Sequence, residues 1–407
     1  MHGERPLKVS LLTGGSDRPY AFGLLNTLVT REIEVDFIGS DEFKPSEVLI
    51  DPKVKFLNLR GDTNPAASRP RKIARIGRYY LRLLQYTVKS DSILFHILWA
   101  NRFVLLDRIL MNLYYKLMGK KIVFTAHNVN EKQRDNCDSI YNRLTLRILY
   151  ALVDHIFVHT NMMKMQLIEE FGVRENKVSV IPFGINNTLP KTDLTGREAR
   201  DRLGLGKEDK VLLFFGRVAN YKGLEYAIEA LNYLVKTDDR FRLVVAGRIE
   251  RGCEDYWNNI ESVIERYGLG KHVVKRINFI PDDEVEIFFK SADVLILPYK
   301  AIFQSGLQFL AYGFGLPVIA TDIGSFREDI IEGKTGMICR SEDADDLADK
   351  IHAFFRGDLF ANLQQARSEI MEYGNRKYSW EEVGNITGAV YERLFDKIGW
   401  NQVDQKF

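Results

Sequence analysis

Short apolar runs alternate along the chain with longer segments in which apolar residues recur every three or four positions. In the first half, the runs that predict strands are residues 8–12, 33–39, 54–59, 92–97, 121–126, 155–160 and 178–184. Segments of helical length and period, such as AFGLLNTLVTRE and MMKMQLIEEFG, lie between several of them. Strands that alternate with helices at this spacing are typical of parallel sheets covered by helices.

A polar stretch, residues 186–210, interrupts this alternation and reads as a connector with one short helix. A second set of predicted strands follows at residues 211–216, 242–247, 276–280, 294–298, 317–321 and 336–339. The last periodic segment, residues 379–399, predicts a helix with no strand after it. The pattern therefore predicts an α/β protein made of two successive doubly wound units.

Composition agrees with two ordinary globular cores, because the 407 residues are 45% apolar and 28% charged. Three cysteines, far apart and odd in number, give no disulfide framework and fit a reducing compartment. The first residues lack the apolar core of a signal peptide, and no run of apolar residues is long enough to span a membrane. We therefore expect a cytoplasmic protein.

Charge is nearly balanced overall but concentrated in one region. Residues 65–123 contain twelve lysines and arginines and only two acidic residues. Within that region, residues 69–89 predict an amphipathic helix with Ile73, Ile76 and Tyr80 on one side and arginines on the others. The basic segment 69–121 therefore favours contact with an anionic membrane surface. The alternative is a surface helix that packs on its own domain. No nucleic-acid motif accompanies the charge, so nucleic acid is not an expected partner.

In parallel α/β sheets, ligands bind where strands end and helices begin. After residues 8–12 come Gly14 and Gly15, which allow a backbone to approach a ligand closely, although they also suit a plain tight turn. After residues 121–126 comes His127, which can contact a substrate hydroxyl or move a proton. The alternative for His127 is a structural histidine.

The strongest candidate site follows residues 211–216. Arg217 stands at the strand end and Lys222 where the next helix begins, so both can meet one phosphate-bearing ligand. The alternative is two solvated cations. Later, Gln304-Ser305-Gly306 opens a predicted helix whose free amides suit a diphosphate, although Ser305 alone could be an N-cap.

Two motifs are set aside. Asp343 and Asp345 have the spacing of a metal-binding pair but lie at a predicted helix start, where acidic residues are common. Gly204-Leu205-Gly206 follows no strand and is no dinucleotide fingerprint. We expect neither a metal ion nor a cofactor.

Several segments occur in an order and spacing that together resemble the retaining glycosyltransferases of family 4. They are VSVIPFGINN, FFGRVANYKGLEYAIEAL, LVVAGR, FIPDDEVEIFFKSADVLILPY, QSG, GLPVIATDIGSFREDIIEGKTG and YSW. The resemblance is densest from residue 178 to residue 380. It implies the GT-B architecture, two Rossmann-like doubly wound parallel-sheet domains facing across a cleft. The acceptor domain would be residues 1–188, the donor domain 189–384, and a terminal helix, 385–407, would pack back on the first domain.

The resemblance also implies roles for individual residues. Arg217 and Lys222 match the pair that binds the diphosphate, and His127 matches a histidine near the transferred sugar. Further positions implied to contact substrates are Gly14, Gly15, Gly247, Arg248, Phe279, Ile280, Gln304, Ser305 and Gly306. Ile302 and Leu310 stand where the family carries the two glutamates of Glu-x7-Glu. With the ribose contact missing there, Gln308 or Glu328 is expected to supply part of it.

The implied reaction moves a sugar from a nucleoside diphosphate to an acceptor hydroxyl with retention of configuration and without a metal ion. The leaving phosphate oxygen would take the acceptor proton. The basic segment favours a lipid-linked or polysaccharide-precursor acceptor. Two alternatives stay open: a non-catalytic scaffold in a glycan-assembly complex, suggested by Leu310, and a nucleotide-sugar epimerase on the same fold.

Overall fold

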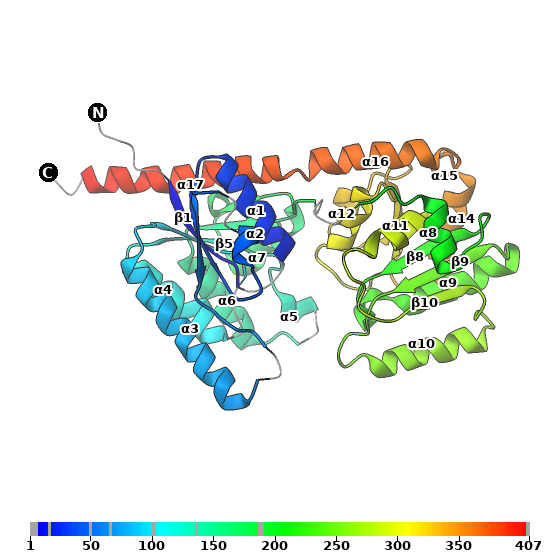
Figure 1. The fold of residues 1–407 in the computed structure, drawn as a ribbon, viewed down its shortest axis with the longest axis horizontal. Coiled ribbons are helices and arrows are strands. Elements are labelled where there is room, and N and C mark those ends of the chain that lie inside the picture. The colour runs from blue at the N-terminus through cyan, green and yellow to red at the C-terminus, as the bar shows by residue number, and fades with distance from the viewer. Residues whose placement is uncertain are drawn as a thin grey trace. The chain divides into compact units, whose positions relative to one another are not determined.

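A computed structural model describes residues 7–14, 18–48, 51–64, 67–99, 103–134, 137–185 and 191–403 (Figure 1). The chain forms two compact units. Unit 1 comprises Met1–Gly184 and Trp380–Phe407, and unit 2 comprises Ile185–Ser379. These bounds differ by a few residues from the predicted 188/189 and 384/385, because the backbone of Ile185 already bonds Tyr378 of unit 2 (N···O 2.9 Å).

Unit 1 contains a parallel sheet in the order β3-β2-β1-β4-β5-β6-β7. Its strands are β1 Lys8–Leu12, β2 Glu34–Gly39, β3 Val54–Asn58, β4 Leu94–Ile97, β5 Lys121–Thr125, β6 His155–Val158 and β7 Val178–Val180. Its helices are α1 Arg18–Thr30, α2 Pro45–Val48, α3 Arg69–Lys89, η1 Leu106–Leu110, α4 Met111–Leu117, α5 Glu131–Arg134, α6 Ile140–Leu152, α7 Asn161–Phe171, η2 Glu175–Lys177 and α17 Trp380–Val403. The strand order reverses between β1 and β4, and ligands of doubly wound sheets bind at such a point.

Unit 2 contains a parallel sheet in the order β10-β9-β8-β11-β12-β13, which reverses between β8 and β11. Its strands are β8 Lys210–Phe215, β9 Phe241–Ala246, β10 Val273–Arg276, β11 Val294–Leu297, β12 Val318–Thr321 and β13 Gly336–Cys339. Its helices are α8 Gly196–Leu203, η3 Asn220–Lys222, α9 Leu224–Thr237, α10 Glu254–Arg266, α11 Val285–Ser291, α12 Gly306–Gly313, α13 Phe326–Asp329, α14 Ala344–Arg356, α15 Asp358–Ala361 and α16 Leu363–Lys377. The central strands of both sheets are buried and apolar, as the sequence pattern predicts, while the edge strands β3 and β10 are partly exposed.

Two predicted elements are corrected by the structure. The strand predicted at 276–280 is β10, which begins three residues earlier because Val273 and Val274 pair with Leu243 and Val244 of β9. The connector predicted at 186–210 is, over its described part, an element of unit 2. Its helix α8 is anchored by Arg200, whose guanidinium pairs with the buried carboxylate of Asp293 at 2.8 Å.

Helix α17 belongs to unit 1 although it follows unit 2 in sequence. Its residues Val383, Val390, Tyr391 and Leu394 lie in the core that β1, β2 and α1 build. A Cβ added to Gly23 of α1 would lie 2.1 Å from the Trp380 ring, so only glycine leaves room for that indole.

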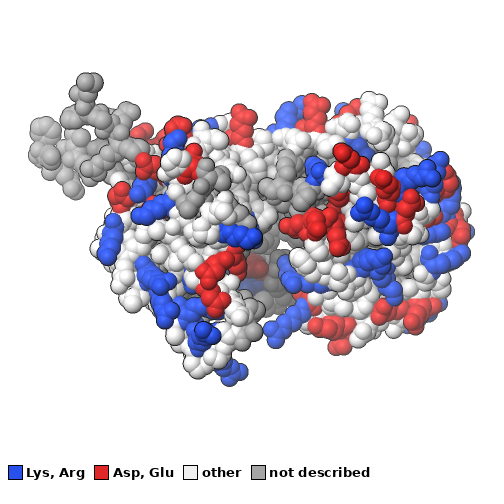
Figure 2. Space-filling view, viewed as in Figure 1, with Lys and Arg blue, Asp and Glu red and all other residues white. Residues whose placement is uncertain are grey.

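Helix α3 packs on unit 1 through its C-terminal half, where Tyr79, Tyr80 and Leu83 are buried and the Tyr80 hydroxyl donates to Asp107 at 2.6 Å. The predicted apolar stripe is therefore displaced. Ile73, which we expected to pack, is 71% exposed. The N-terminal half of α3 projects its basic side chains to solvent, as Figure 2 shows along the lower left of the view.

Candidate functional site

In unit 2, the loops that follow β8 and β9 lie in close contact. The amide of Gly216 donates to Ala246 (2.8 Å), and Gly247 has a φ of +143°. A Cβ on Gly247 would lie 1.9 Å from the Gly216 carbonyl oxygen, so the approach requires glycine. Val218 and Arg248 continue the pairing backbone to backbone at 2.9 Å, while the Arg248 side chain is exposed. The loops form a fixed platform at the carboxyl end of the sheet.

Lys222 ends the short helix η3 and is only 6% exposed. Its Nζ lies 3.0 Å from the position that a Cβ would occupy on Gly216 and 5.3 Å from the centre of the Tyr299 ring. No described residue makes a hydrogen bond or ion pair with this ammonium group. Burial accordingly lowers the pKa of Lys222 from its ordinary 10.5 to about 8. A buried cation without a counterion at a strand end is a place for an anionic ligand.

Arg217 differs from Lys222 because it is already paired. Its side chain is 55% exposed, and its Nη1 lies 2.7 Å from Oε1 of Glu250. Its charge is close enough to lower the pKa of Lys222 further, after burial. Arg217 and Lys222 therefore lie together at the end of β8, but in this state only Lys222 lacks an anionic partner.

The loop that follows β11 is fixed by its neighbours. Lys300 donates its amide to the carbonyl of Tyr221 (2.8 Å), and its Nζ pairs with Glu225 at 2.8 Å. On the other side, the amide of Ser325 donates to Phe303 at 3.0 Å. Leu307, in the first turn of α12, lies against Gly216. The start of α12 thus lies next to the platform that carries Lys222.

The Gln304-Ser305-Gly306 turn at the start of α12 has the form expected of a ligand loop. Ser305 is buried and occupies the N-cap position of α12, as its alternative role predicts, but its side chain makes no capping bond to the helix. The Oε1 of Gln304 is buried and has no hydrogen-bond partner among the described residues. Gly306 is exposed and leaves the first amides of α12 accessible.

The residues expected to contact the base and the ribose differ in their exposure to solvent. Phe279 is 65% exposed in the loop after β10, while Ile280 is buried. Glu328 lies exposed in α13. Gln308, in contrast, is fully buried and donates to the Tyr312 hydroxyl at 3.2 Å. Its Oε1 has no hydrogen-bond partner among the described residues, so the expected ribose contact of Gln308 stays a prediction.

In unit 1, the loop after β5 carries His127 into a cluster of rings. Trp99 stacks on His127 with ring centres 4.3 Å apart and planes 5° from parallel. Tyr20 approaches edge-on at 4.7 Å. The Nδ1 of His127 lies 3.0 Å from the Nε2 of His159, and the Nε2 of His127 is buried without a partner among the described residues.

These contacts determine which nitrogen of His127 carries the proton. Burial lowers the pKa of His127 well below its ordinary value and that of His159 to about 4, so both rings are neutral. His159 Nδ1 faces the carbonyl oxygen of Ile181 at 3.3 Å and must donate to it, since a carbonyl only accepts. His159 Nε2 is then an acceptor, and His127 donates to it through Nδ1. The remaining Nε2 of His127 is an acceptor that needs a donor.

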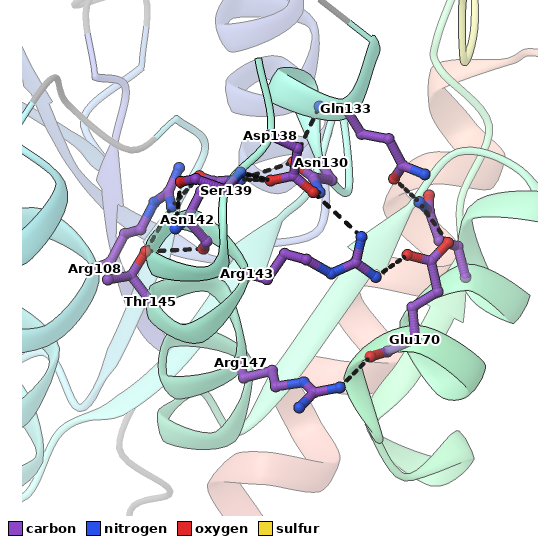
Figure 3. A network of polar contacts seen from close by, with 11 residues as sticks. Arg108, Asn130, Gln133, Asp138, Ser139, Asn142, Arg143, Thr145, Arg147 and Glu170 are labelled. Atoms are coloured by element: carbon purple, nitrogen blue, oxygen red, sulfur yellow. Dashed lines mark hydrogen bonds and ion pairs between the residues drawn. The ribbon is translucent and has the colours of Figure 1, made fainter. Parts of the chain in front are cut away.

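A polar network holds the loop that carries His127 (Figure 3). The Tyr150 hydroxyl donates to the carbonyl of Val129 at 2.6 Å. Asn142 donates to Asn130 at 2.9 Å, and Asn130 donates to Asp138 at 2.8 Å. Figure 3 shows the part of the network around Asn130, Asp138 and Asn142, and the other side chains drawn there extend it across α6 and α7. The network therefore holds Val129 and Asn130, which follow His127 in the same loop.

Gly14 lies beside this cluster at the end of β1. It has a φ of +64°, and a Cβ there would lie 2.5 Å from the Trp99 carbonyl oxygen. Gly15, its predicted partner, lies outside the described residues. Within the described part of the chain, no group of three His, Cys, Asp or Glu side chains could hold a metal ion. Asp343 is the N-cap of α14, as its position predicts, and accepts from Asp346 at 2.9 Å.

Sequence reasoning missed three residues of these constellations. Trp99 and Tyr299 follow strand ends and could have been noticed as aromatic side chains at ligand-binding positions. His159 continues the apolar pattern of the predicted strand 155–160, which by itself favours a structural role. The signal that it faces His127 comes only from the neighbouring positions of β5 and β6 in the sheet.

Family models match both units. The model "Glycosyltransferase Family 4" matches residues 18–189, and the model "Glycosyl transferases group 1" matches residues 196–376. The chain belongs to the family 4 type of glycosyltransferase. Among curated proteins, D-inositol 3-phosphate glycosyltransferase of Corynebacterium aurimucosum is 27% identical over 249 residues, which cover 58% of each protein. The chain spans less than two thirds of the length of the first curated relatives that it matches.

Solved structures show the same fold. Sucrose-phosphate synthase from Thermosynechococcus elongatus superimposes with a TM-score of 0.74 at 18% identity, over 97% of this chain and 100% of that one. Anabaena HepE in complex with UDP gives 0.71 at 14% identity, over 96% and 100%. Together with the two parallel-sheet units, this likeness establishes the GT-B, Rossmann-like fold that the sequence predicts. No helix among the described residues is long and apolar enough to cross a membrane.

Proposed function

We propose that the chain transfers a sugar, of hexose type, from a nucleoside-diphosphate sugar to an acceptor hydroxyl with retention of configuration. The observation that carries this proposal is the buried, unpaired ammonium group of Lys222, which lies beside the accessible amides of α12 at the reversal point of the unit 2 sheet. The structure of HepE with UDP supports the donor class, because that protein shares the fold.

In the proposed reaction, negative charge develops on the leaving phosphate as the glycosidic bond breaks. Lys222 and the amides at Ser305 and Gly306 stabilise that charge, and Arg217 joins them by exchanging Glu250 for the phosphate. Loss of one fixed donor of this type costs about 3–4 kcal/mol of barrier in other enzymes. The departing oxygen takes the acceptor proton, and we propose that these cations act without a metal ion.

The remaining contacts are proposed from what each unit shows by itself. We propose that a hydroxyl of the transferred sugar donates to Nε2 of His127, because this buried acceptor otherwise stays unsatisfied. The exposed ring of Phe279 stacks on the base, beside Ile280. Glu328 remains the proposed ribose contact, since Gln308 is buried and Leu310 is apolar.

For the acceptor, we propose a lipid-linked or polysaccharide precursor that the chain reaches from the cytoplasmic face of a membrane. The basic segment 69–121 supports this, and it also exposes apolar side chains. Leu110 of η1 is 56% exposed and Leu117 of α4 is 78% exposed. Sedimentation with anionic vesicles tests the contact: replacing both leucines with serine should reduce binding at constant charge, and an unchanged bound fraction would contradict it.

The donor proposal is tested by thermal shift with UDP, GDP, ADP and their sugar conjugates, because a ligand stabilises the folded state in proportion to its occupancy. We expect one of the three nucleoside diphosphates, with its sugar conjugates, to raise the melting temperature of the wild type. The same ligands should leave the melting temperature of Lys222→Ala unchanged. Lys236→Ala, an exposed lysine on α9, is the matched control. If no nucleoside diphosphate stabilises the wild type, the chain is not a transferase, and a scaffold role takes its place.

A further inference from the structure

A cationic cavity lies in unit 1, far in sequence from Lys222 of unit 2. It has a volume of about 330 Å³ and lies between the loop after β3 and the exposed half of α3. Its only acidic lining residue is Asp62. Five arginines line it: Arg60, Arg71, Arg75, Arg78 and Arg82. Ligand pockets for small molecules begin at about this size.

The helix places four of these arginines on one side. Positions 71, 75, 78 and 82 are separated by four, three and four residues, which brings them onto one face of α3. Like charges at this spacing repel one another. Helix α3 buries Tyr80 and Leu83 in unit 1, while the four arginines and Tyr79 line the cavity.

Only part of this charge is compensated. Arg75 pairs with Asp62 at 3.2 Å. Arg60 donates to the carbonyl of Gly14 and lies 5.9 Å above the ring of Tyr79. Arg71, Arg78 and Arg82 make no ion pair with any described residue. A concave wall with several unpaired guanidinium groups concentrates positive potential, and their forked donors match the oxygens of a phosphate.

We propose that this arginine cavity binds a phosphate or diphosphate group carried by the acceptor. The site rests on the proposed function for its role, and it specifies the acceptor class. The guanidinium of Arg60 donates to the carbonyl of Gly14, which links one wall of the cavity to the end of β1. The cavity is bounded and small, which favours a compact phosphorylated group over the backbone of a nucleic acid.

The test is calorimetry with inorganic pyrophosphate in the Lys222→Met background, so that the donor site does not contribute. We expect saturable binding that Arg78→Gln/Arg82→Gln weakens at least tenfold. The matched control is Lys72→Gln/Lys89→Gln, which removes equal charge from the same helix outside the cavity and should retain the affinity within twofold. An equal loss in both variants, or no binding at all, overturns the proposal. So does a polyuridylate that binds more tightly than pyrophosphate through the same arginines.

Vesicles distinguish the source of the phosphate. If a lipid carries it, the wild type sediments with phosphatidic acid vesicles, the cavity variant does not, and the control variant does. If the acceptor is a soluble sugar phosphate, pyrophosphate binding persists although no variant sediments. Nucleotide binding at Lys222 is measured separately in the wild type and in Arg78→Gln/Arg82→Gln. Failure of the donor site and failure of the arginine cavity are therefore separate results.

Discussion

Replacing Lys222 with methionine should make the protein more stable and at the same time abolish donor binding. Methionine has a similar length and carries no charge, so it removes only the buried ammonium group. The pKa of Lys222 falls from 10.5 to about 8 because burial disfavours the charged form. Since a tenfold change in an acid constant corresponds to about 1.4 kcal/mol, the charged lysine destabilises the unliganded fold by about 3 kcal/mol.

The pH dependence follows from the same two pKa values. Below pH 8 the lysine is charged in both the folded and the unfolded protein, and the wild type is less stable by the full amount. Between pH 8 and 10.5 only the unfolded chain retains the proton, so the free energy of unfolding of the wild type rises with pH. Lys222→Met lacks this rise. The stability difference should therefore be greatest near pH 7 and disappear near pH 10.5.

Urea unfolding of both proteins, followed by circular dichroism at pH 7, 9 and 10, measures this difference. Lys236→Met is the control, because that lysine is exposed on α9 and should show no pH-dependent change. A variant less stable than the wild type at pH 7 would refute the reasoning. So would a stability difference that stays constant over the pH series, since Lys222 would then not be buried without a partner.

Three further predictions test other parts of the site. His127 should carry its proton on Nδ1, as read from ¹⁵N shifts, and His159→Phe should give a mixture of tautomers; an Nε2–H form in the wild type would contradict the hydrogen bond from His127 to His159. Phe279→Ala should weaken nucleotide binding in calorimetry by about 1–3 kcal/mol while pyrophosphate binding stays unchanged; equal nucleotide affinity would exclude a base contact. Gly268→Ala should destabilise the fold by only about 1–2 kcal/mol, because its Cβ would meet no atom within 4 Å. Gly247→Ala should destabilise the fold by more than that, and equal melting temperatures of the two variants would exclude the close approach of Gly247 to Gly216.

Most of the fold follows from local sequence signals. Buried parallel strands are continuous apolar runs, and helices between them have a clear period, so the alternation is visible without tertiary information. The exception is the position of β10. The apolar run RINFI, residues 276–280, predicts a strand there, but the strand is Val273–Arg276. Val273 and Val274 form the strand because β9 offers them partners. A local pattern does not contain that pairing.

The candidate site is less predictable than the fold. Position alone places Arg217 and Lys222 at the end of β8, but it assigns both the same role. Their difference arises from tertiary neighbours: Glu250 pairs with Arg217, and the packing of Tyr299 leaves Lys222 buried. In the same way, Gln308 has the chemistry of a ribose contact but is oriented into the core, which its residue type does not reveal.

The most direct test of the donor site is the titration of the Lys222 ammonium group itself. In protein labelled with ¹³C at the lysine Cε, the Lys222 resonance can be assigned by its absence from Lys222→Met. We predict that it titrates near pH 8 in the free protein and shifts back toward 10.5 when a nucleoside diphosphate saturates the site. Titration at 10.5 in the free protein, or a midpoint that does not move when the nucleotide binds, would contradict the account.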